Sequence, residues 1–301
     1  MQMPRDLQIQ PVVHAPLQGI ALMIAAFTIF AALDTTAKYL VQFYPPEQVV
    51  WARYTGHCVL ALVILWPRNG AALLRSQRLG TQVLRSLLLF ATTCTNFVAL
   101  QYLQLAETSA IFFSTPLIVA LLSVPLLGER IGPRRWTAIL IGFLGVLVVV
   151  RPGLGLMHWA AGLSLLTAIG AALYQITTRK LAGVDPAATT QFYTALVGTL
   201  AITPLVPFTW QTPDLTGVLL MALLGALGGF GHWLLILAHR MAPAPILAPF
   251  NYTQIAPMVL LGFLVFGDLP DAWTVSGAGV VLASGLYLLY RERKVKAAAR
   301  P

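Results

Sequence analysis

The chain has 301 residues; 58% of them are hydrophobic, 10% are charged, and the formal net charge is +9. A soluble globular protein carries about 25% charged residues, so this composition excludes an ordinary soluble domain. The polar connections between the apolar stretches are short, and the positive charge therefore indicates membrane insertion rather than nucleic-acid binding.

Ten apolar stretches follow one another along the chain, and most are long enough to cross a bilayer as a helix. Crossing a hydrocarbon core of about 30 Å takes roughly 20 helical residues. Long apolar runs without alternation are helices, because only helices and closed barrels satisfy the backbone polar groups in lipid. The stretches are Leu17–Leu40, Pro46–Trp66, Leu84–Tyr102, Leu105–Leu127, Trp136–Val150, His158–Thr178, Pro186–Phe208, Leu215–His239, Pro245–Phe266 and Trp273–Tyr290. We therefore expect an all-α membrane protein with ten transmembrane helices, in a single membrane domain over residues 1–301.

The Lys and Arg residues fall almost entirely on one side of the predicted membrane. Ten spans put both termini on that side, which holds sixteen of the 19 basic residues, including Arg85 at the border of the third stretch. The opposite side holds Lys38 and Arg151, and Arg53 lies within a span. Because basic residues accumulate in cytoplasmic loops, we expect a multi-pass protein of the cell inner membrane with both termini in the cytoplasm.

Four charged residues lie in or near the first two predicted helices. Asp34 and Arg53 are about 10 Å from the outer ends of their helices at 1.5 Å per residue, and we expect them to pair because a lone charge in the membrane is costly. Lys38 and Glu47 are shallower and also match in depth, although Lys38 has Asp34 one turn away as an alternative partner. The four residues form either a substrate-capture site or outer gate, or a structural clamp between helices.

Prolines occur in the fourth and ninth predicted helices, among them Pro116 and Pro257. A proline inside a helix frees a backbone carbonyl and bends the helix. Breaks in corresponding helices of two repeats point to a binding site in membrane transporters. We therefore predict that Pro116 and Pro257 act as hinges.

Polar and aromatic side chains recur on single faces of several predicted helices. Thr92 and Asn96 share a face of the third helix, and Asn251 and Gln254 share a face of the ninth. Such residues either form hydrogen bonds between helices or line a cavity, and as a set they favour a central cavity. The predicted substrate-binding residues are Thr92, Asn96, Phe113, Tyr174, Gln175, Asn251, Tyr252 and Gln254, with Phe113 and Tyr252 as aromatic walls.

The second half of the chain repeats the pattern of the first. Leu127-Gly128-Glu129 precedes Trp136-Thr137, and Phe266-Gly267-Asp268 precedes Trp273-Thr274 in the same way. We expect the repeats at residues 17–152 and 157–292. Each repeat holds five spans, an odd number, so the second repeat must enter the membrane from the opposite side. A 5+5 inverted repeat around a central cavity is typical of secondary transporters.

These residues resemble the EamA-like branch of the drug/metabolite transporter superfamily over roughly residues 17–292. The matching motifs are Asn251-Tyr252-Thr253-Gln254, the run from Phe266 to Thr274, Ala283-Ser284-Gly285-Leu286-Tyr287 and, in the first half, Pro116, Gly128-Glu129-Arg130 and Trp136. The resemblance implies a substrate cavity lined mainly by helices 1, 3, 4, 6, 8 and 9. The chain departs from the family pattern at Asp268, where a Gly-Glu pair is commoner, and its two prolines lie at unequal distances from the following glycine.

Enzymatic and metal-binding motifs are absent from the sequence. It has no HExxH pair, Walker A loop, GxSxG elbow or paired CxxC, and its five histidines lack metal-ligand spacing. We therefore expect no enzymatic activity, no cofactor and no bound metal. Any transport must then run without ATP hydrolysis.

The expected function is secondary transport of a small metabolite by alternating access. The family resemblance implies an exporter of amino acids or related amphipathic compounds. An uptake transporter for a vitamin- or nucleoside-like metabolite and a channel are alternatives, and an integral-membrane enzyme is an alternative of another class. The expected partners are a small-molecule substrate and the lipid bilayer, and the sequence indicates no oligomeric state.

Overall fold

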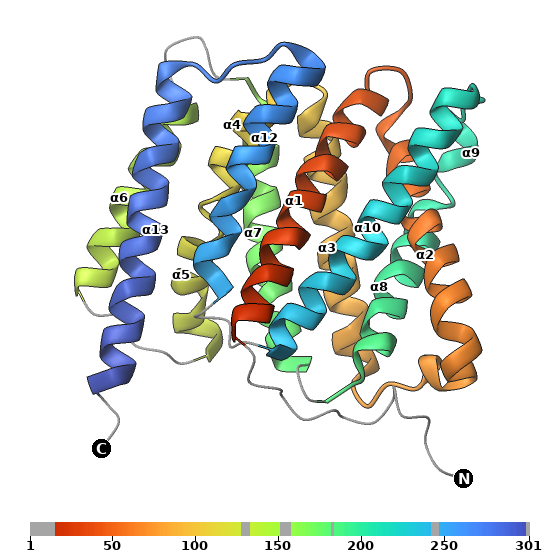
Figure 1. Cartoon of the computed structure of the whole chain (residues 1–301), viewed down its shortest axis with the longest axis horizontal. Coiled ribbons are helices and arrows are strands. Elements are labelled where there is room, and N and C mark those ends of the chain that lie inside the picture. The colour runs from red at the N-terminus through yellow and green to blue at the C-terminus, as the bar shows by residue number, and fades with distance from the viewer. Residues whose placement is uncertain (1–15, 128–132, 151–157, 182–183, 242–246, 299–301) are drawn as a thin grey trace.

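The structure, a computed structural model, describes residues 16–127, 133–150, 158–181, 184–241 and 247–298, and these ranges are helical without any β-strand (Figure 1). The predicted all-α fold class is confirmed. The first half comprises α1 (Pro16–Leu40), α2 (Pro46–Asn69), η2 (Gly70–Leu74), α3 (Leu79–Leu100), α4 (Leu105–Phe112), α5 (Thr115–Leu127) and α6 (Pro133–Val150). The second half comprises α7 (Ala160–Leu181), α8 (Ala187–Ile202), α9 (Val206–Thr209), α10 (Leu215–Met241), η3 (Ala248–Gln254), α12 (Ile255–Leu261), η4 (Gly262–Phe266) and α13 (Ala272–Ala298).

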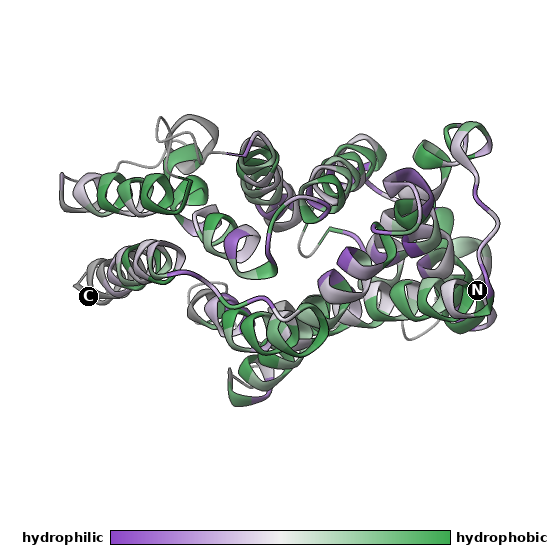
Figure 2. Ribbon diagram, turned by 90° about the horizontal axis from the view of Figure 1, so that it is seen from above, coloured by the Kyte–Doolittle hydropathy of each residue, from purple (hydrophilic) through white to green (hydrophobic). Residues whose placement is uncertain are grey.

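Within the residues that the structure describes, five helical segments are long and apolar enough to cross a membrane. They are Leu17–Leu40, Pro46–Leu74, Leu79–Leu100, Ala160–Thr178 and Leu215–Ala238, and four shorter apolar segments accompany them. Most helical residues are hydrophobic in the view from above (Figure 2). Large side chains such as Leu140, Leu219 and Leu264 are more than half exposed, an arrangement suited to lipid rather than water. The chain is therefore a helical membrane protein, whereas ten complete crossings stay a prediction.

The contacts between helices repeat when the two halves are exchanged. α1 packs against α10, and its counterpart α7 packs against α3, the counterpart of α10. α2 packs against its own counterpart α8, and α6 packs against α13. In Figure 1, α3 rises from the lower edge and α10 descends to that edge. The predicted two-repeat architecture is therefore present, with counterpart helices running in opposite directions.

Glycines allow the tightest helix contacts between the halves. A Cβ atom on Gly56 of α2 would lie 2.9 Å from the Cα of Gly225 on α10, and one on Gly277 of α13 would lie 2.7 Å from the carbonyl oxygen of Gly145 on α6. No side chain fits at these distances, so the backbones themselves are in contact. Small residues at such crossings are the usual means by which membrane helices pack closely.

Two helices are interrupted at equivalent places in the two halves. α4 ends at Phe112 and α5 begins at Thr115, with Pro116 as its second residue. In the second half, the 3-10 segment η3 passes into α12 after Gln254, and Pro257 is the third residue of α12. A proline has no N–H to donate, so it fits the first turn after a break. Both breaks lie where Pro116 and Pro257 predicted bends, and movement about them stays a prediction.

Candidate functional site

A cavity lies between the two halves of the molecule, surrounded by α1, α3, α4, α7, α10, η3 and α12. Its empty volume is about 1180 Å³, part of which is open solvent. The surrounding elements are those that the family resemblance implies. One addition is α2, from which Arg53 reaches the cavity. The sequence predicted Arg53 as part of a substrate-capture site or outer gate, or of a structural clamp.

Six predicted polar residues line this cavity together: Thr92, Asn96, Tyr174, Gln175, Asn251 and Gln254. The two predicted aromatic walls do not line it. Phe113 and Tyr252 pack edge to face with ring centres 5.2 Å apart and are 2% and 6% exposed in an apolar cluster, so their assignment as cavity walls was wrong. The aromatic surface of the cavity comes instead from Phe27, Phe30, Phe97 and Phe112.

The carboxylate of Asp34 lies in the cavity wall between two amides. Asn96 Nδ2 donates a hydrogen bond to Asp34 Oδ1 at 3.0 Å, and Gln254 Nε2 donates to Oδ2 at 3.4 Å. Asn96 belongs to α3 and Gln254 to η3, so this carboxylate connects the two halves across the cavity. Neither amide is charged, so no basic side chain is hydrogen-bonded to this carboxylate among the described residues.

Arg53 lines the same cavity but does not pair with Asp34, so this predicted ion pair was wrong. Its guanidinium donates to Thr93 Oγ1 at 3.1 Å, contacts His232 Nε2 at 3.1 Å, and lies 4.6 Å from the centre of the Tyr54 ring. Among the described residues, no carboxylate forms an ion pair with Arg53. The cavity thus contains one negative and one positive side chain that do not neutralise each other by direct contact.

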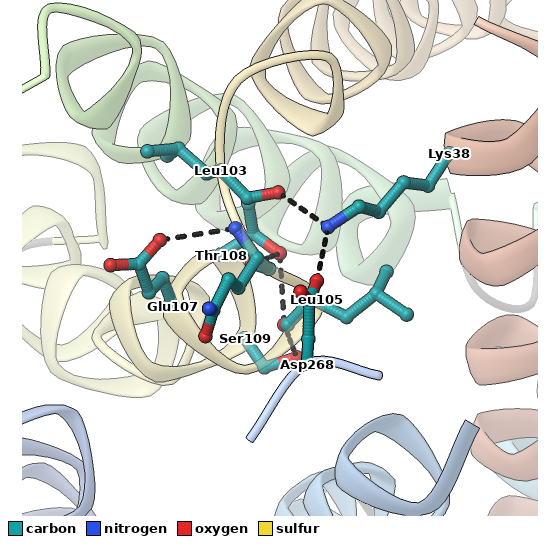
Figure 3. Close-up of polar contacts among 8 residues, drawn as sticks. Lys38, Leu103, Leu105, Glu107, Thr108, Ser109 and Asp268 are labelled. Carbon is teal, nitrogen blue, oxygen red and sulfur yellow. Dashed lines mark hydrogen bonds and ion pairs between the residues drawn. The ribbon is translucent and has the colours of Figure 1, made fainter. Parts of the chain in front are cut away.

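Lys38 pairs with neither of its predicted partners, Asp34 and Glu47, and both predictions were wrong. Its Nζ donates to Asp268 Oδ2 at 2.8 Å and to the backbone carbonyl of Leu103 at 3.1 Å (Figure 3). These partners lie in the connections before α13 and before α4. Lys38 therefore joins three segments from both halves, at the edge of the molecule where α1 ends.

Arg85 is a buried charge that the sequence analysis assigned to the cytoplasmic edge. α3 begins at Leu79 rather than at Leu84, so Arg85 lies inside the helix, where it is 1% exposed. Its guanidinium donates three hydrogen bonds to hydroxyls, at 2.7 Å to Thr178, 2.7 Å to Thr194 and 2.6 Å to Tyr174. The sequence does contain a signal for this residue, because Arg85 belongs to a polar helix face that extends the cavity face by two turns. The residues of this face are Gln82, Arg85, Ser86, Thr92, Thr93 and Asn96.

A pair of histidines lies beside these two arginines. The rings of His57 and His232 are parallel, with centres 6.3 Å apart. Gln191 joins the pair through a contact of 2.7 Å between its Nε2 and His57 Nε2. His232 lines the cavity, whereas His57 lies behind it. In the described part of the chain, no group of three or more His, Cys, Asp or Glu side chains has the geometry of a metal site.

Outside the cavity, Asp185 fixes the connection between α7 and α8 to the start of α3. Its carboxylate accepts hydrogen bonds from Ser76 Oγ at 2.6 Å, from the Gln77 backbone N–H at 2.9 Å and from Gln82 Nε2 at 2.9 Å. Burial acts to raise the pKa of Asp185, but the three hydrogen bonds outweigh burial and lower this pKa below its ordinary value.

Known proteins resemble this chain over nearly its whole length. It is 27% identical to an S-adenosylmethionine uptake transporter of Rickettsia bellii over 278 residues, which is 92% of this chain and 94% of the relative. It is 29% identical to a riboflavin transporter of Vibrio cholerae, with 93% and 96% covered, and 27% identical to the pseudopaline exporter CntI of Pseudomonas aeruginosa, with 92% and 97% covered.

The EamA-like transporter family model matches this chain twice, at residues 17–151 and 158–291. Two matches in succession agree with the two-repeat fold. The family and the names of these relatives point to transport and away from the alternative of an integral-membrane enzyme. The chain therefore belongs to the EamA-like transporter family, and it is a membrane transporter of small metabolites.

Proposed function

We propose that this chain is a secondary transporter that moves a small amphipathic metabolite, amino-acid derived and zwitterionic, through the central cavity by alternating access. The observation that carries this proposal is the cavity with Asp34 and Arg53 in its walls, unpaired with each other. Charges within a membrane protein are costly and mark substrate or ion pathways. A ligand with both a positive and a negative group would compensate both side chains at once.

The remaining cavity wall suits the rest of such a ligand. Amides and hydroxyls from Asn96, Gln175 and Asn251 offer hydrogen bonds, and Phe27, Phe30 and other apolar side chains cover the remaining surface. A few polar groups orient a ligand while apolar walls accept variable shapes. We infer that selectivity is moderate and depends mainly on charge.

Alternating access is supported by two features of the fold. The helices interrupted near Pro116 and Pro257 both contribute to the cavity, and such broken helices surround transporter binding sites. The Lys38–Asp268 pair connects the halves at one edge, where it must open before a substrate passes that edge. We assign Lys38 and Asp268 the gate role that the sequence predicted for Lys38 with other partners.

The direction of transport has two candidates. Export of amino acids or related compounds follows from the family resemblance in the sequence, and one relative is named an exporter. Uptake is favoured by the relatives named S-adenosylmethionine uptake transporter. S-adenosylmethionine carries an amino-acid zwitterion, a sulfonium cation and a nucleoside, so it has the charges that the cavity would bind. We propose it as the first probe for either direction.

Counterflow in proteoliposomes tests the proposal. Purified protein, without ATP, is expected to exchange labelled S-adenosylmethionine or L-methionine for unlabelled ligand, with a rate that saturates. Asp34→Asn should lower kcat/KM about tenfold or more, because a charge-assisted contact is lost. Asp214→Asn, at an exposed helix start where Asn caps equally well, is the control and should behave as the native protein. Net accumulation in right-side-out or inside-out vesicles then gives the direction.

Two results would contradict the proposal. Flux that rises linearly with concentration, without counterflow, indicates a channel. Saturable counterflow of riboflavin alone, unaffected by Asp34→Asn, indicates the second candidate function, vitamin uptake. That candidate is favoured by the 29% identity to a riboflavin transporter.

A further inference from the structure

Tyr174 lies in the wall of the cavity, and Arg85 lies directly behind it and is hydrogen-bonded to it. Arg85 Nη2 donates to the Tyr174 hydroxyl at 2.6 Å, and the Arg85 Cζ lies 4.5 Å from the centre of the Tyr174 ring. Arg85 itself does not line the cavity, but Tyr174 does. An interaction between Arg85 and a ligand therefore acts through Tyr174.

Of the three hydroxyl groups that accept hydrogen bonds from Arg85, one has a proton without an acceptor among the described residues. Thr178 and Thr194 accept from Arg85 and donate their own protons to the backbone carbonyls of Tyr174 and Thr190, at 2.7 Å and 2.8 Å. The Tyr174 hydroxyl also accepts from Arg85, and no described residue accepts its proton. This O–H is therefore available to donate to a ligand, and the adjacent guanidinium polarises it and makes it a stronger donor.

Two further donors near Tyr174 have no acceptor. Arg53 can only donate, so His232 Nε2 must accept from it and the His232 proton lies on Nδ1. This His232 N–H and the Arg53 Nε–H are both buried without a partner. The ring of His232 lies 6.4 Å from that of Tyr174, centre to centre. This end of the cavity thus has a surplus of donors and two guanidinium charges, without a carboxylate bonded to either among the described residues.

We propose that Tyr174 and Arg53 form the subsite for the anionic group of the substrate, and that Arg85 is the positioning residue that orients and polarises Tyr174. Asp34 then binds the cationic group. Its partner Asn96 lies one helical turn from Thr93, the partner of Arg53, so the two charged side chains border the same part of the cavity. The arrangement fixes the orientation of a zwitterion and makes a carboxylate a requirement for tight binding. This proposal rests on the proposed function and adds to it which residues recognise the anionic group of the substrate and which recognise the cationic group.

Paired ligands that differ only in the carboxylate test the subsite. The probes are S-adenosylmethionine with its decarboxylated form and L-methionine with methioninamide, in the counterflow assay. The native protein should prefer the carboxylate member about tenfold or more, because a hydrogen bond to a charged group is at stake. Tyr174→Phe should raise KM for the carboxylate ligand and leave the KM of its partner unchanged. Arg85→Gln should act in the same direction, and Arg85→Lys should retain part of the preference.

Tyr193→Phe provides the matched control. Tyr193 is also a buried tyrosine, but its hydroxyl donates to the Leu74 carbonyl at 2.8 Å and the residue does not line the cavity. Loss of the Tyr193 hydroxyl should not alter the preference between the paired ligands. The subsite proposal would be overturned, although transport persists, by either of two results. One is an equal loss of transport of both paired ligands in Tyr174→Phe, and the other is the absence of any preference for the carboxylate ligand in the native protein. Absence of saturable counterflow for every probe in the native protein would instead overturn the proposed function, and the subsite with it.

Discussion

At the scale of single residues, the charges in and directly behind the cavity are accommodated by neutral polar groups. Asp34 is held by amides and Arg85 by hydroxyls. The sequence indicated that Asp34 and Arg53 lie at similar depth, but depth gives no lateral position. α10 packs against both α1 and α2, so it lies between the two helices that carry these charges. Depth along a helix is readable from sequence, whereas the order of helices around the bundle is not.

The amide faces, in contrast, could be predicted residue by residue. Thr92 and Asn96, and likewise Asn251 and Gln254, are spaced so that they share a helix face, and all four line the cavity. The prediction that Phe113 lines the cavity was wrong because the helix ends immediately before it, at the end of α4. The Phe113 ring therefore packs into the apolar cluster with Tyr252. A periodic pattern holds only while the helix continues.

Asp185 gives a prediction for stability. Its three hydrogen bonds hold the connection between α7 and α8, so Asp185→Asn should lower the free energy of unfolding at pH 7 by about 1–3 kcal/mol. The folded-state pKa is below the ordinary value of 3.8. The carboxylate therefore stabilises the fold above this value, and the stabilisation is lost as the pH falls through the lower pKa.

Thermal unfolding in detergent between pH 3 and pH 7 measures this effect. The difference between native protein and Asp185→Asn should be full near neutral pH and shrink at the acidic end. The exposed Asp214→Asn is a control that should show no such trend. A difference that grows towards low pH would contradict the role of Asp185.

At the scale of elements, the link between Lys38 and Asp268 is the most specific connection across the edge where α1 ends. It joins α1 to the connections before α4 and before α13 (Figure 3). In the sequence, Asp268 departs from the family pattern, but no feature of the sequence indicates its partner. The partner is 230 residues away in the chain. The two residues meet because the two inverted halves pack against each other.

A charge swap tests this gate. Lys38→Asp and Asp268→Lys should each slow counterflow, because each places like charges at the link and disturbs the closed edge. The double variant should recover part of the rate, since the pair is restored while the bond to the Leu103 carbonyl is lost. Rates of the two single variants and the double variant in proteoliposomes measure the coupling. Equal rates in all three variants would show that the pair does not control access.

At the scale of the whole molecule, composition and the internal repeat predicted most of the fold. The apolar stretches predicted helices. The recurring Gly-acid and Trp-Thr motifs indicated two halves, and the paired helix contacts agree with this prediction. The sequence did not reveal the 3-10 and π segments η3 and η4, because these are local responses of the backbone to packing. The cavity lies beside such a segment, so its finer shape could not be read from periodicity.

Membrane orientation is the prediction that belongs to the whole molecule. α1 begins and α13 ends at the same edge (Figure 1). Moving Arg85 into the bundle leaves fifteen basic residues against two, so the bias still predicts that both termini lie in the cytoplasm. A green fluorescent protein fused after Pro301 should fluoresce, and an alkaline phosphatase fused there should be inactive. Active phosphatase at this position would reverse the assignment.

The partners of Arg85 also predict an order in which the helices complete their insertion. α3 enters the membrane carrying a charge whose hydroxyl partners, Tyr174, Thr178 and Thr194, are 89 to 109 residues further along the chain. While the ribosome is still making α4 to α6, the nascent α3 has no such partners. We expect its guanidinium to remain near water at the bilayer surface during this time. We therefore expect α3 to reach its final depth only after α7 and α8 have been inserted, so that the first half completes its insertion with the help of the second.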